Sequence, residues 1–395
     1  MSTLLDPLAY GLLPFWGLFM TERIPQGRIP ELDGLRGMAI LLVLVGHYFS
    51  VPGIGAASLL NGYWFRLGWT GVDLFFVLSG FLIGGILLGV RESPNYFKTF
   101  YARRFFRIIP LYYAWILIYV ILSVSARSLI AARIGSVQKV DVSILAHFIF
   151  LQNFHEFLKG TVSFWWFSST WSLAVEEQFY LVVPLLVRYL SKRALAVVLV
   201  SVTLGAPILR FAVLKSFSEG PWLAYRLMPC RADSLAVGVL AALIWNSPRA
   251  RAWLETHSLF LRVLFAALFV GVAYLWRYHS DPLLPLTQIA GYTWLALFFA
   301  VGLLLAISRR KSILSTLMRL GFLRELGGVS YCIYIIHTAV YLFCHMLLLH
   351  ALPAVTAGRA ALVTLLAALV TYAIAKLSWK FFEQPLLQRG HAFQY

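Results

Sequence analysis

The residues of this sequence with the clearest chemical potential are an arginine and a histidine eleven positions apart. The stretch "DGLRGMAILLVLVGHYFS" (residues 33–50) is apolar enough to enter a membrane, yet it carries Arg36 and His47. An ionisable side chain in such a stretch is costly and usually faces a protein interior or a water-filled cavity. At about 100° per residue, eleven residues make about three helical turns, so both side chains project from one face. Because its ordinary pKa is about 6.5, His47 is a candidate general base.

Helix geometry also sets the depth of this histidine. Eleven residues at 1.5 Å each place His47 about 16 Å beyond Arg36, near the midplane of a bilayer core that is about 30 Å thick. Arg36 then marks the mouth of the cavity that His47 lines. The structural alternative is a histidine bonded to a neighbouring helix and an arginine that only extends to the lipid interface.

Several acidic side chains fall in apolar stretches of a chain that has only 16 Asp and Glu. "GVDLFFVLSGFL" places Asp73 near the outer end of a span and Ser79 near its middle, and "TWSLAVEEQFYL" contains Glu176 and Glu177 side by side. Two adjacent carboxylates cannot both face lipid cheaply. We expect one of them to face a cavity and the other to bond the backbone.

Two further stretches add polar groups to this set. "CRADSLAVG" carries Arg231 and Asp233, whose plain alternative reading is a structural ion pair. "SYCIYIIHTAVY" carries His337 near mid-depth, where it is as consistent with a core histidine as with a ligand. Together these candidate cavity-lining residues predict a single cavity that opens toward both faces of the membrane.

Basic residues gather in the segment that precedes the third predicted span. Arg91, Lys98, Arg103, Arg104 and Arg107 crowd what we expect to be a loop. They serve either membrane orientation alone or the binding of an anionic co-substrate, for which guanidinium groups are well suited.

The elements that must position these residues are transmembrane helices. The chain of 395 residues is 61% hydrophobic and 12% charged, against about 25% charged residues in soluble domains. We predict an all-α, polytopic membrane protein with about ten spans in one bundle and no room for a soluble catalytic domain. The spans are expected at residues 35–51, 70–90, 108–124, 171–190, 194–213, 230–246, 259–276, 286–307, 326–349 and 360–382.

The distribution of Lys and Arg predicts the orientation. With both termini cytoplasmic, 22 of them lie on the inner side and 11 on the other, which accounts for all 33. The net charge of +17 is therefore explained by the membrane and does not predict a nucleic-acid partner. Residues 1–28 are expected to form an interfacial segment, and 388–395 a cytoplasmic tail. The three cysteines have no metal-ligand spacing, so we expect no metal.

A cavity of this kind has two possible functions. A transporter would alternate access around His47 or the glutamates, which would carry protons. An enzyme would use His47 as a base and the arginines to bind an anionic co-substrate. Transporters often contain inverted repeats, and we find no matching pair of broken helices, so the sequence favours an enzyme.

The whole set of motifs resembles the acyltransferase family 3 membrane proteins, which acylate sugars of O-antigens, exopolysaccharides and nodulation factors. The resemblance covers about residues 29–387. Arg36 and His47 match the family's Arg/Lys-x10-His signature, and Arg104 and Arg107 its Arg-x-x-Arg segment. The matching stretches, in order, are "LDGLRGMAILLVLVGH", "GVDLFFVLSGFLI", "FYARRFFRIIPLYY", "TWSLAVEEQFYL", "RADSLAVG", "SYCIYIIH" and "FFEQPL".

The resemblance implies an O-acyltransferase of the inner (plasma) membrane. The implied co-substrate is cytoplasmic acyl-CoA, most simply acetyl-CoA, with no bound cofactor, and the implied acceptor is a carbohydrate or lipid-linked sugar. It also implies that Arg36 and His47 are essential and that Arg103, Arg104 and Arg107 help to bind the donor. Some relatives carry an additional extracytoplasmic hydrolase-like domain, so a separate extracytoplasmic partner is a further expectation.

Two mechanisms remain open at this point. In the first, His47, oriented by Glu176 or Glu177, removes the proton from the sugar hydroxyl for direct attack on the thioester. In the second, Ser79 or His47 is acylated first. We favour direct transfer because no serine has a base at an obvious helical spacing.

Overall fold

The computed structural model describes residues 29–49, 65–125, 142–159, 166–308, 312–355 and 358–395. Helices account for nearly all of these residues, and no strand occurs among them. The predicted interfacial segment 1–28 lies outside the described residues. The long helices are α1 (Pro30–Phe49), α2 (Gly71–Gly89), α3 (Tyr96–Ser125), α7 (Thr170–Tyr189), α8 (Lys192–Ser216), α10 (Met228–Trp245), α12 (Ser258–Tyr278), α13 (Tyr292–Ser308), α15 (Gly321–Leu349) and α16 (Gly358–Ser378).

Short helices connect or extend the long ones. Single turns of 3-10 or π geometry lead into α2 and α13 and follow α16. These short elements are α5 (Ile144–Phe148), α6 (Gln152–Lys159), α9 (Gly220–Arg226), α11 (Pro248–Thr256), α14 (Ile313–Met318), α17 (Gln384–His391), η2 (Gly68–Thr70), η3 (Thr287–Gly291) and η4 (Trp379–Glu383).

The prediction of a polytopic helical bundle is confirmed. In the described part of the chain, nine helices are long and apolar enough to cross a membrane, so the chain is a multi-pass membrane protein. The remaining long helix, α7, has 20 residues and falls outside this group because it carries Glu176 and Glu177. Nine of the ten predicted spans begin within about five residues of a helix start, within or just beyond the usual uncertainty of sequence-based boundaries.

Helix α3 differs most from the prediction. It starts at Tyr96, twelve residues before the predicted span, so Arg103, Arg104 and Arg107 lie on a helix and the predicted loop is wrong. The reason is the spacing of its large apolar residues, which recur at helical intervals and are almost completely buried. This buried face consists of Tyr96, Phe100, Ile108, Tyr112 and Ile116.

The bundle is built around two pairs of closely packed helices, α1 with α15 and α2 with α10. Small residues allow this close approach, as is usual for helices in membranes. A side chain at Gly80 of α2 would place its Cβ 2.1 Å from the carbonyl oxygen of Leu235, and one at Gly238 of α10 would lie 2.3 Å from that of Val77. The two backbones therefore touch.

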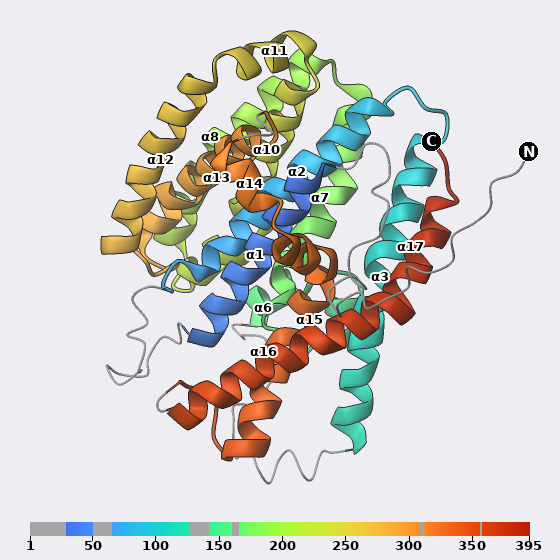
Figure 1. Cartoon of the computed structure of the whole chain (residues 1–395), viewed down its shortest axis with the longest axis vertical. Coiled ribbons are helices and arrows are strands. Elements are labelled where there is room, and N and C mark those ends of the chain that lie inside the picture. The colour runs from blue at the N-terminus through green and yellow to red at the C-terminus, as the bar shows by residue number, and fades with distance from the viewer. Residues whose placement is uncertain (1–28, 50–64, 126–141, 160–165, 309–311, 356–357) are drawn as a thin grey trace, which may run out of the picture.

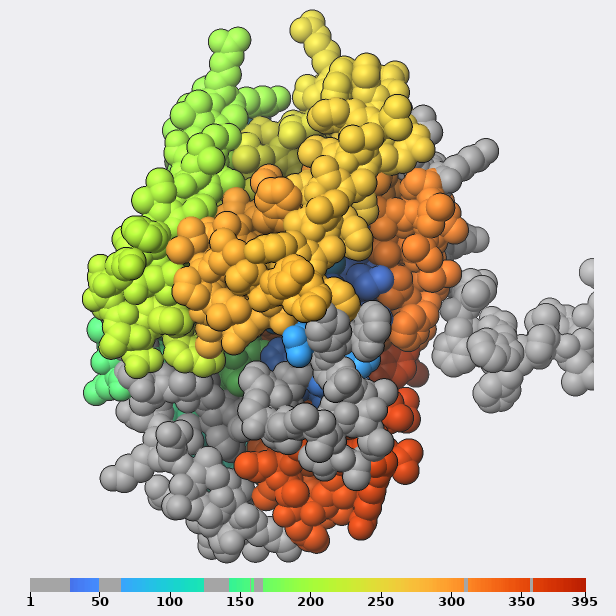
Figure 2. Space-filling view, turned by 90° about the vertical axis from the view of Figure 1, so that its left-hand side faces the viewer, coloured from blue at the N-terminus to red at the C-terminus, as the bar shows by residue number. Residues whose placement is uncertain are grey.

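The remaining helices surround these pairs (Figure 1). Helices α8, α12 and α13 lie on one side, and α3 and α17 lie together on the other. Figure 2 shows α12 and α13 over the upper and middle part of one face of the molecule. Helix α12 exposes Leu259, Val263, Phe269 and Val270, as expected for a surface in contact with lipid.

The end of the bundle that carries Arg91 and the first half of α3 is called the basic end below. Helices α1, α3 and α15 begin there, and α2, α7 and α10 end there. The predicted tail from residue 388 begins inside α17, which packs against α3 at this end (Figure 1).

Candidate active site

Two histidines from different helices are in contact with each other. His47 lies in the last turn of α1, and His337 lies near the middle of α15. Their rings are 4.9 Å apart between centroids, and Nε2 of His337 is 3.3 Å from Nδ1 of His47. His337 is completely buried, whereas His47 is exposed. The sequence did not indicate this pairing, because 290 residues separate the two positions.

The hydrogen bonds of the pair determine which ring nitrogens carry hydrogen. Nδ1 of His337 lies 2.8 Å from the carbonyl oxygen of Tyr334 and 3.1 Å from that of Ile333. Nδ1 of His47 lies 3.0 Å from the carbonyl oxygen of Val43. Because a carbonyl oxygen only accepts, both Nδ1 atoms must donate. In the neutral pair, Nε2 of His337 therefore accepts from Nδ1 of His47, and Nε2 of His47 has a free lone pair.

Aromatic and hydroxyl side chains hold the two helices in this register. The hydroxyl of Tyr48 donates to the carbonyl oxygen of His337 at 3.0 Å and lies 3.1 Å from the hydroxyl of Thr371 on α16. The hydroxyl of Tyr341 donates to the carbonyl oxygen of Tyr48 at 2.9 Å. Three helices thus fix the position of the histidine pair.

A narrow cavity, called the long cavity below, connects the basic end with the neighbourhood of these histidines. Its volume is about 160 Å³. Arg36, Arg104 and Arg107 line it on the basic side, and Ser172 and Tyr334 line its other end. Along α2 its wall extends from residue 86 to residue 72, a length of about 21 Å at 1.5 Å per residue.

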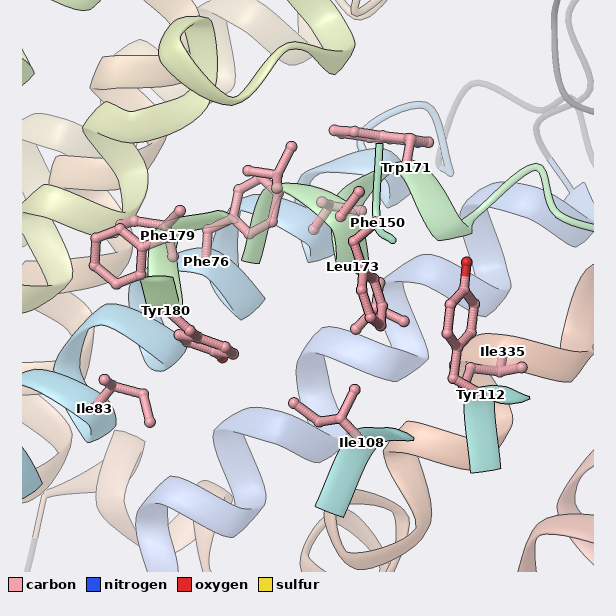
Figure 3. Packing of buried hydrophobic residues seen from close by; sticks show 14 of the residues in the cluster. Phe76, Ile83, Ile108, Tyr112, Phe150, Trp171, Leu173, Phe179, Tyr180 and Ile335 are labelled. Atoms are coloured by element: carbon pink, nitrogen blue, oxygen red, sulfur yellow. The ribbon is translucent and has the colours of Figure 1, made fainter. Parts of the chain in front are cut away.

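The wall of the long cavity is mostly apolar and aromatic. Figure 3 shows Phe76 and Ile83 of α2, Ile108 of α3 and Tyr180 of α7, four of these wall residues, which come from three helices. Such a wall favours a slender, largely uncharged chain, while the three arginines favour a negative charge at the basic end.

Tyr334 lies next to both the long cavity and the histidine pair. Its ring lines the cavity and lies 5.9 Å from the ring of His337. Its hydroxyl donates to the carbonyl oxygen of Ser169 at 3.1 Å and lies 2.5 Å from the hydroxyl of Ser172. No sequence pattern indicated Tyr334 beyond its position three residues before His337, because tyrosines are common in apolar helices.

Glu176 and Ser79 belong to the long cavity and form a hydrogen-bonded chain in it. The hydroxyl of Tyr180 donates to Oε2 of Glu176 at 3.0 Å and is also hydrogen-bonded to the hydroxyl of Ser79. Arg104 lies over the ring of Tyr180, 5.6 Å from its centre. Ser79 therefore has a polar partner on another helix, and the spacing of residues along α2 alone could not indicate it.

The glutamates do not take the position that the sequence suggested for them. We expected Glu176 or Glu177 to orient His47, but the structure places His337 next to His47 instead. Glu176 lies among the arginines of the long cavity. Oε1 of Glu177 is buried and has no hydrogen-bond partner among the described residues. The catalytic roles proposed for the two glutamates remain predictions.

Arg103 points away from the long cavity, although its neighbour Arg104 lines it. The guanidinium of Arg103 donates twice to the carbonyl oxygen of Phe393, at 3.0 and 2.7 Å, and lies 4.9 Å from the centre of the Tyr395 ring. It therefore joins α3 to the residues that follow α17. A role for Arg103 in donor binding stays a prediction that this geometry does not support.

The charged residues expected in the outer half form buried ion pairs. Nη2 of Arg231 lies 2.7 Å from Oδ1 of Asp73, and Nη1 of Arg210 lies 2.9 Å from Oδ2 of Asp233. All four side chains are completely buried, and none lines the long cavity. These contacts favour a structural role for the charged residues. Arg231 pairs with Asp73, and Asp233 pairs with Arg210, so the pair of Arg231 with Asp233 that the sequence suggested does not form.

The donor set offers no obvious metal site. Within the described ranges, no three His, Cys, Asp or Glu side chains lie close enough together to hold a metal ion.

Comparison with known proteins agrees with these features. Residues 29–376 match the family described as an acyltransferase domain, and the chain belongs to this family. It is 28% identical over 393 residues to the peptidoglycan O-acetyltransferase OatA of Listeria monocytogenes. This alignment covers 94% of this chain and 57% of the relative.

Other relatives give the same picture. The chain is 30% identical over 376 residues to a putative peptidoglycan O-acetyltransferase of Bacillus subtilis, covering 92% of this chain and 55% of the relative. It is 26% identical over 391 residues to a putative O-acetyltransferase of Staphylococcus aureus, covering 92% and 58%. The chain thus spans just over half the length of these relatives. No solved structure matches it.

Proposed function

We propose that this protein transfers an acyl group, most simply acetyl, from acyl-CoA to a hydroxyl group of a carbohydrate. The observation that carries the proposal is the long cavity, which leads from Arg36, Arg104 and Arg107 to Tyr334 beside the histidine pair. Membership of the acyltransferase domain family supports it.

The donor enters the long cavity from the basic end. Coenzyme A joins a phosphorylated nucleotide to a slender arm that ends in the thioester. Guanidinium groups bind phosphate with charge-assisted hydrogen bonds, and the apolar wall suits the arm. The length of the cavity, about 21 Å along α2, brings the acyl end of such a donor toward Tyr334 and the histidines.

The transfer itself uses Nε2 of His47. This atom accepts the proton of the sugar hydroxyl while the hydroxyl oxygen forms a bond to the thioester carbon. The carbon–sulfur bond breaks, and the proton on His47 passes to the departing thiolate, which leaves as the free thiol. Nε2 of His337 accepts from Nδ1 of His47 throughout, so it orients the base and stabilises its protonated form.

Movement of Tyr334 is required in this mechanism, because its ring lies between the long cavity and the histidines. Rotation of the ring would release its hydrogen bonds to the 169–172 region and admit the acyl end. In the alternative with an acyl-enzyme intermediate, the Ser79 oxygen forms a bond to the thioester carbon while its proton moves to Glu176 through Tyr180. The carbon–sulfur bond breaks, and the thiolate takes up this proton and leaves as the free thiol.

The acceptor arrives from the side opposite to the basic end. The names of the relatives from Listeria monocytogenes and Bacillus subtilis point to peptidoglycan, so we propose an amino-sugar glycan or its lipid-linked precursor as the acceptor. The excess of Lys and Arg supports our proposal that the basic end faces the cytoplasm and that the protein lies in a plasma membrane. We also propose a separate extracytoplasmic protein as a recipient of the acyl group, because the chain spans just over half the length of these relatives.

The experiment uses purified protein in liposomes, acetyl-labelled acetyl-CoA and soluble glycan fragments. Wild-type protein should move the label to the glycan. His47→Gln keeps hydrogen-bonding capacity but cannot act as a base near pH 7, so its turnover should fall at least about a hundredfold at a normal level of folded protein.

Three results decide the alternatives. Near-normal turnover by His47→Gln would sink the assignment of the base. Label that accumulates on the protein and disappears in Ser79→Ala would favour the acyl-enzyme route. Uptake of intact glycan or acetyl-CoA into the liposomes without any transfer of label would favour a transporter.

A further inference from the structure

A second cavity, called the side pocket below, opens at the basic end and has no role in the mechanism above. Its volume is about 400 Å³, and it lies between the first residues of α1 and the last residues of α2 and α10. Arg36, Leu82 and Ile86 line both the side pocket and the long cavity. The two cavities therefore meet at the side chain of Arg36.

We propose that the side pocket binds the adenine nucleotide end of the donor while the long cavity holds its arm. This inference rests on the function proposed above. A coenzyme A thioester has a slender arm and a broad nucleotide head, joined by a pyrophosphate. The long cavity has a volume of about 160 Å³ along residues 72–86 of α2, whereas the side pocket has a volume of about 400 Å³ beside residues 81–86 of the same helix. The long cavity, Arg36 and the side pocket thus follow one another in the same order as the arm, the pyrophosphate and the nucleotide of the ligand.

The wall of the side pocket has the side chains that a purine requires. Trp245 and Asn246, at the end of α10, both line it. An indole ring offers a flat surface for stacking, and an amide offers one acceptor and two donors to the edge of the base. Arg251 of α11 lies over Trp245, 4.5 Å from the ring centre, and adds a second guanidinium beside the pocket.

Arg36 lies where the pyrophosphate would be. Its Nη1 is 3.7 Å from Oδ1 of Asp33, a buried residue one turn earlier in α1 that also lines the side pocket. This contact keeps the guanidinium at the junction of the two cavities. A planar guanidinium binds two phosphate oxygens at once, which Lys cannot do with the same geometry.

Two glycines of α2 provide a matched pair of variants. Gly85 lines the side pocket, and the nearest atom that a Cβ there would meet is Nδ2 of Asn246 at 3.9 Å. A leucine at this position would therefore extend into the pocket without striking the backbone. Gly89, one turn later, has nothing within 4 Å and lines neither cavity, so Gly89→Leu is the control.

The test compares two donors, acetyl-CoA and acetyl-pantetheine, which lacks the nucleotide. Gly85→Leu should raise the KM for acetyl-CoA about tenfold or more and leave the KM for acetyl-pantetheine within about twofold of wild type. Gly89→Leu should change neither KM. Adenosine 3′,5′-bisphosphate should compete with acetyl-CoA in wild type and Gly89→Leu, and should lose this effect in Gly85→Leu.

Two outcomes would overturn the nucleotide site. One is an equal rise of both KM values in Gly85→Leu, which would mean that the substitution disturbs the arm and not the head. The other is a Gly85→Leu variant in which the KM for acetyl-CoA is unchanged and the bisphosphate still competes. The side pocket would then bind another ligand, such as a lipid headgroup. A wild-type protein that uses neither donor is a different result, because it would refute the proposed function and the nucleotide site with it.

Discussion

At the scale of single residues, the structure changes what is expected of His337. The sequence offered it either as a core histidine or as a residue that lines the cavity, and its contact with His47 gives it a third role, that of a positioning residue. Its Nδ1 is held by two carbonyl oxygens, so its Nε2 can only accept from His47. No pattern within α15 alone indicates which helix its ring will face.

A substitution at His337 tests this role. His337→Phe keeps an aromatic ring but removes the acceptor, so kcat should fall about tenfold to a hundredfold while the KM for acetyl-CoA stays the same. His337→Gln, whose amide oxygen can accept in place of Nε2, should restore part of the loss. The measurement is steady-state transfer per amount of folded protein.

The control for that experiment is another buried histidine of the same helix. His345 is hydrogen-bonded to Thr364 of α16 at 3.0 Å, and its ring lies 4.7 Å from that of Tyr341, whereas no direct contact between His345 and His47 occurs among the described residues. His345→Phe should therefore leave kcat within about threefold of wild type. An equal loss of kcat in His337→Phe and His345→Phe, without rescue by glutamine, would reduce His337 to a packing residue.

Arg104 and Arg103 are adjacent in the sequence and separate in the structure, which makes them a second matched pair. Arg104 lines the long cavity, and Arg103 binds the carbonyl oxygen of Phe393. Arg104→Ala should raise the KM for acetyl-CoA about tenfold, because one charge-assisted hydrogen bond is lost. Arg103→Ala should leave this KM unchanged. If the two variants raise the KM equally, the donor site extends over the Arg103 side of α3 as well.

At the scale of helices, the sequence predicted which segments form membrane-spanning helices, but it did not predict which side chains of different helices meet. The long apolar stretches are unambiguous because a span needs about 20 such residues. The start of α3 was missed because its arginines lower the local hydropathy, although Tyr96 and Phe100 already continue its buried face. The shared wall of the long cavity could not be predicted from the sequence, because it depends on how five helices face one another.

Contact between α2 and α10 gives a prediction at this scale. In Gly238→Ala the added Cβ would lie 2.3 Å from the carbonyl oxygen of Val77, so the two backbones must separate. We expect a loss of about 1–3 kcal/mol in the free energy of unfolding, measured as a lower thermal midpoint in detergent. Gly205→Ala of α8, where nothing lies within 4 Å, should be neutral or slightly stabilising because alanine is the better helix former. Equal midpoints for the two variants would contradict the close packing.

At the scale of the whole molecule, the orientation in the membrane is the property that the proposals need most. The excess of Lys and Arg predicts a cytoplasmic basic end. Ser191→Cys and Arg249→Cys lie at this end and Glu219→Cys at the other, and all three positions are exposed. An impermeant thiol reagent added to intact cells should label only Glu219→Cys.

The native cysteines set the background for that measurement, since Cys230 and Cys332 are buried and Cys344 is partly exposed. Labelling of Ser191→Cys from outside, above this background, would reverse the orientation. The donor would then have to come from outside the cell, where acyl-CoA is not supplied, so the proposed function would fall with the orientation.

The position of Tyr334 has a consequence for the energy balance of the cell that contains this protein. A bacterial plasma membrane stores energy as a proton gradient. A continuous water-filled path through a protein would let protons leak across the membrane and dissipate this gradient. The long cavity runs from the basic end only as far as Tyr334 and Ser172, and the exposed His47 lies beyond them. We therefore expect the hydrogen bond between these two hydroxyls to keep water and protons from passing between the cavity and His47. The proposed mechanism therefore requires that this hydrogen bond break only while an acyl chain fills the gap.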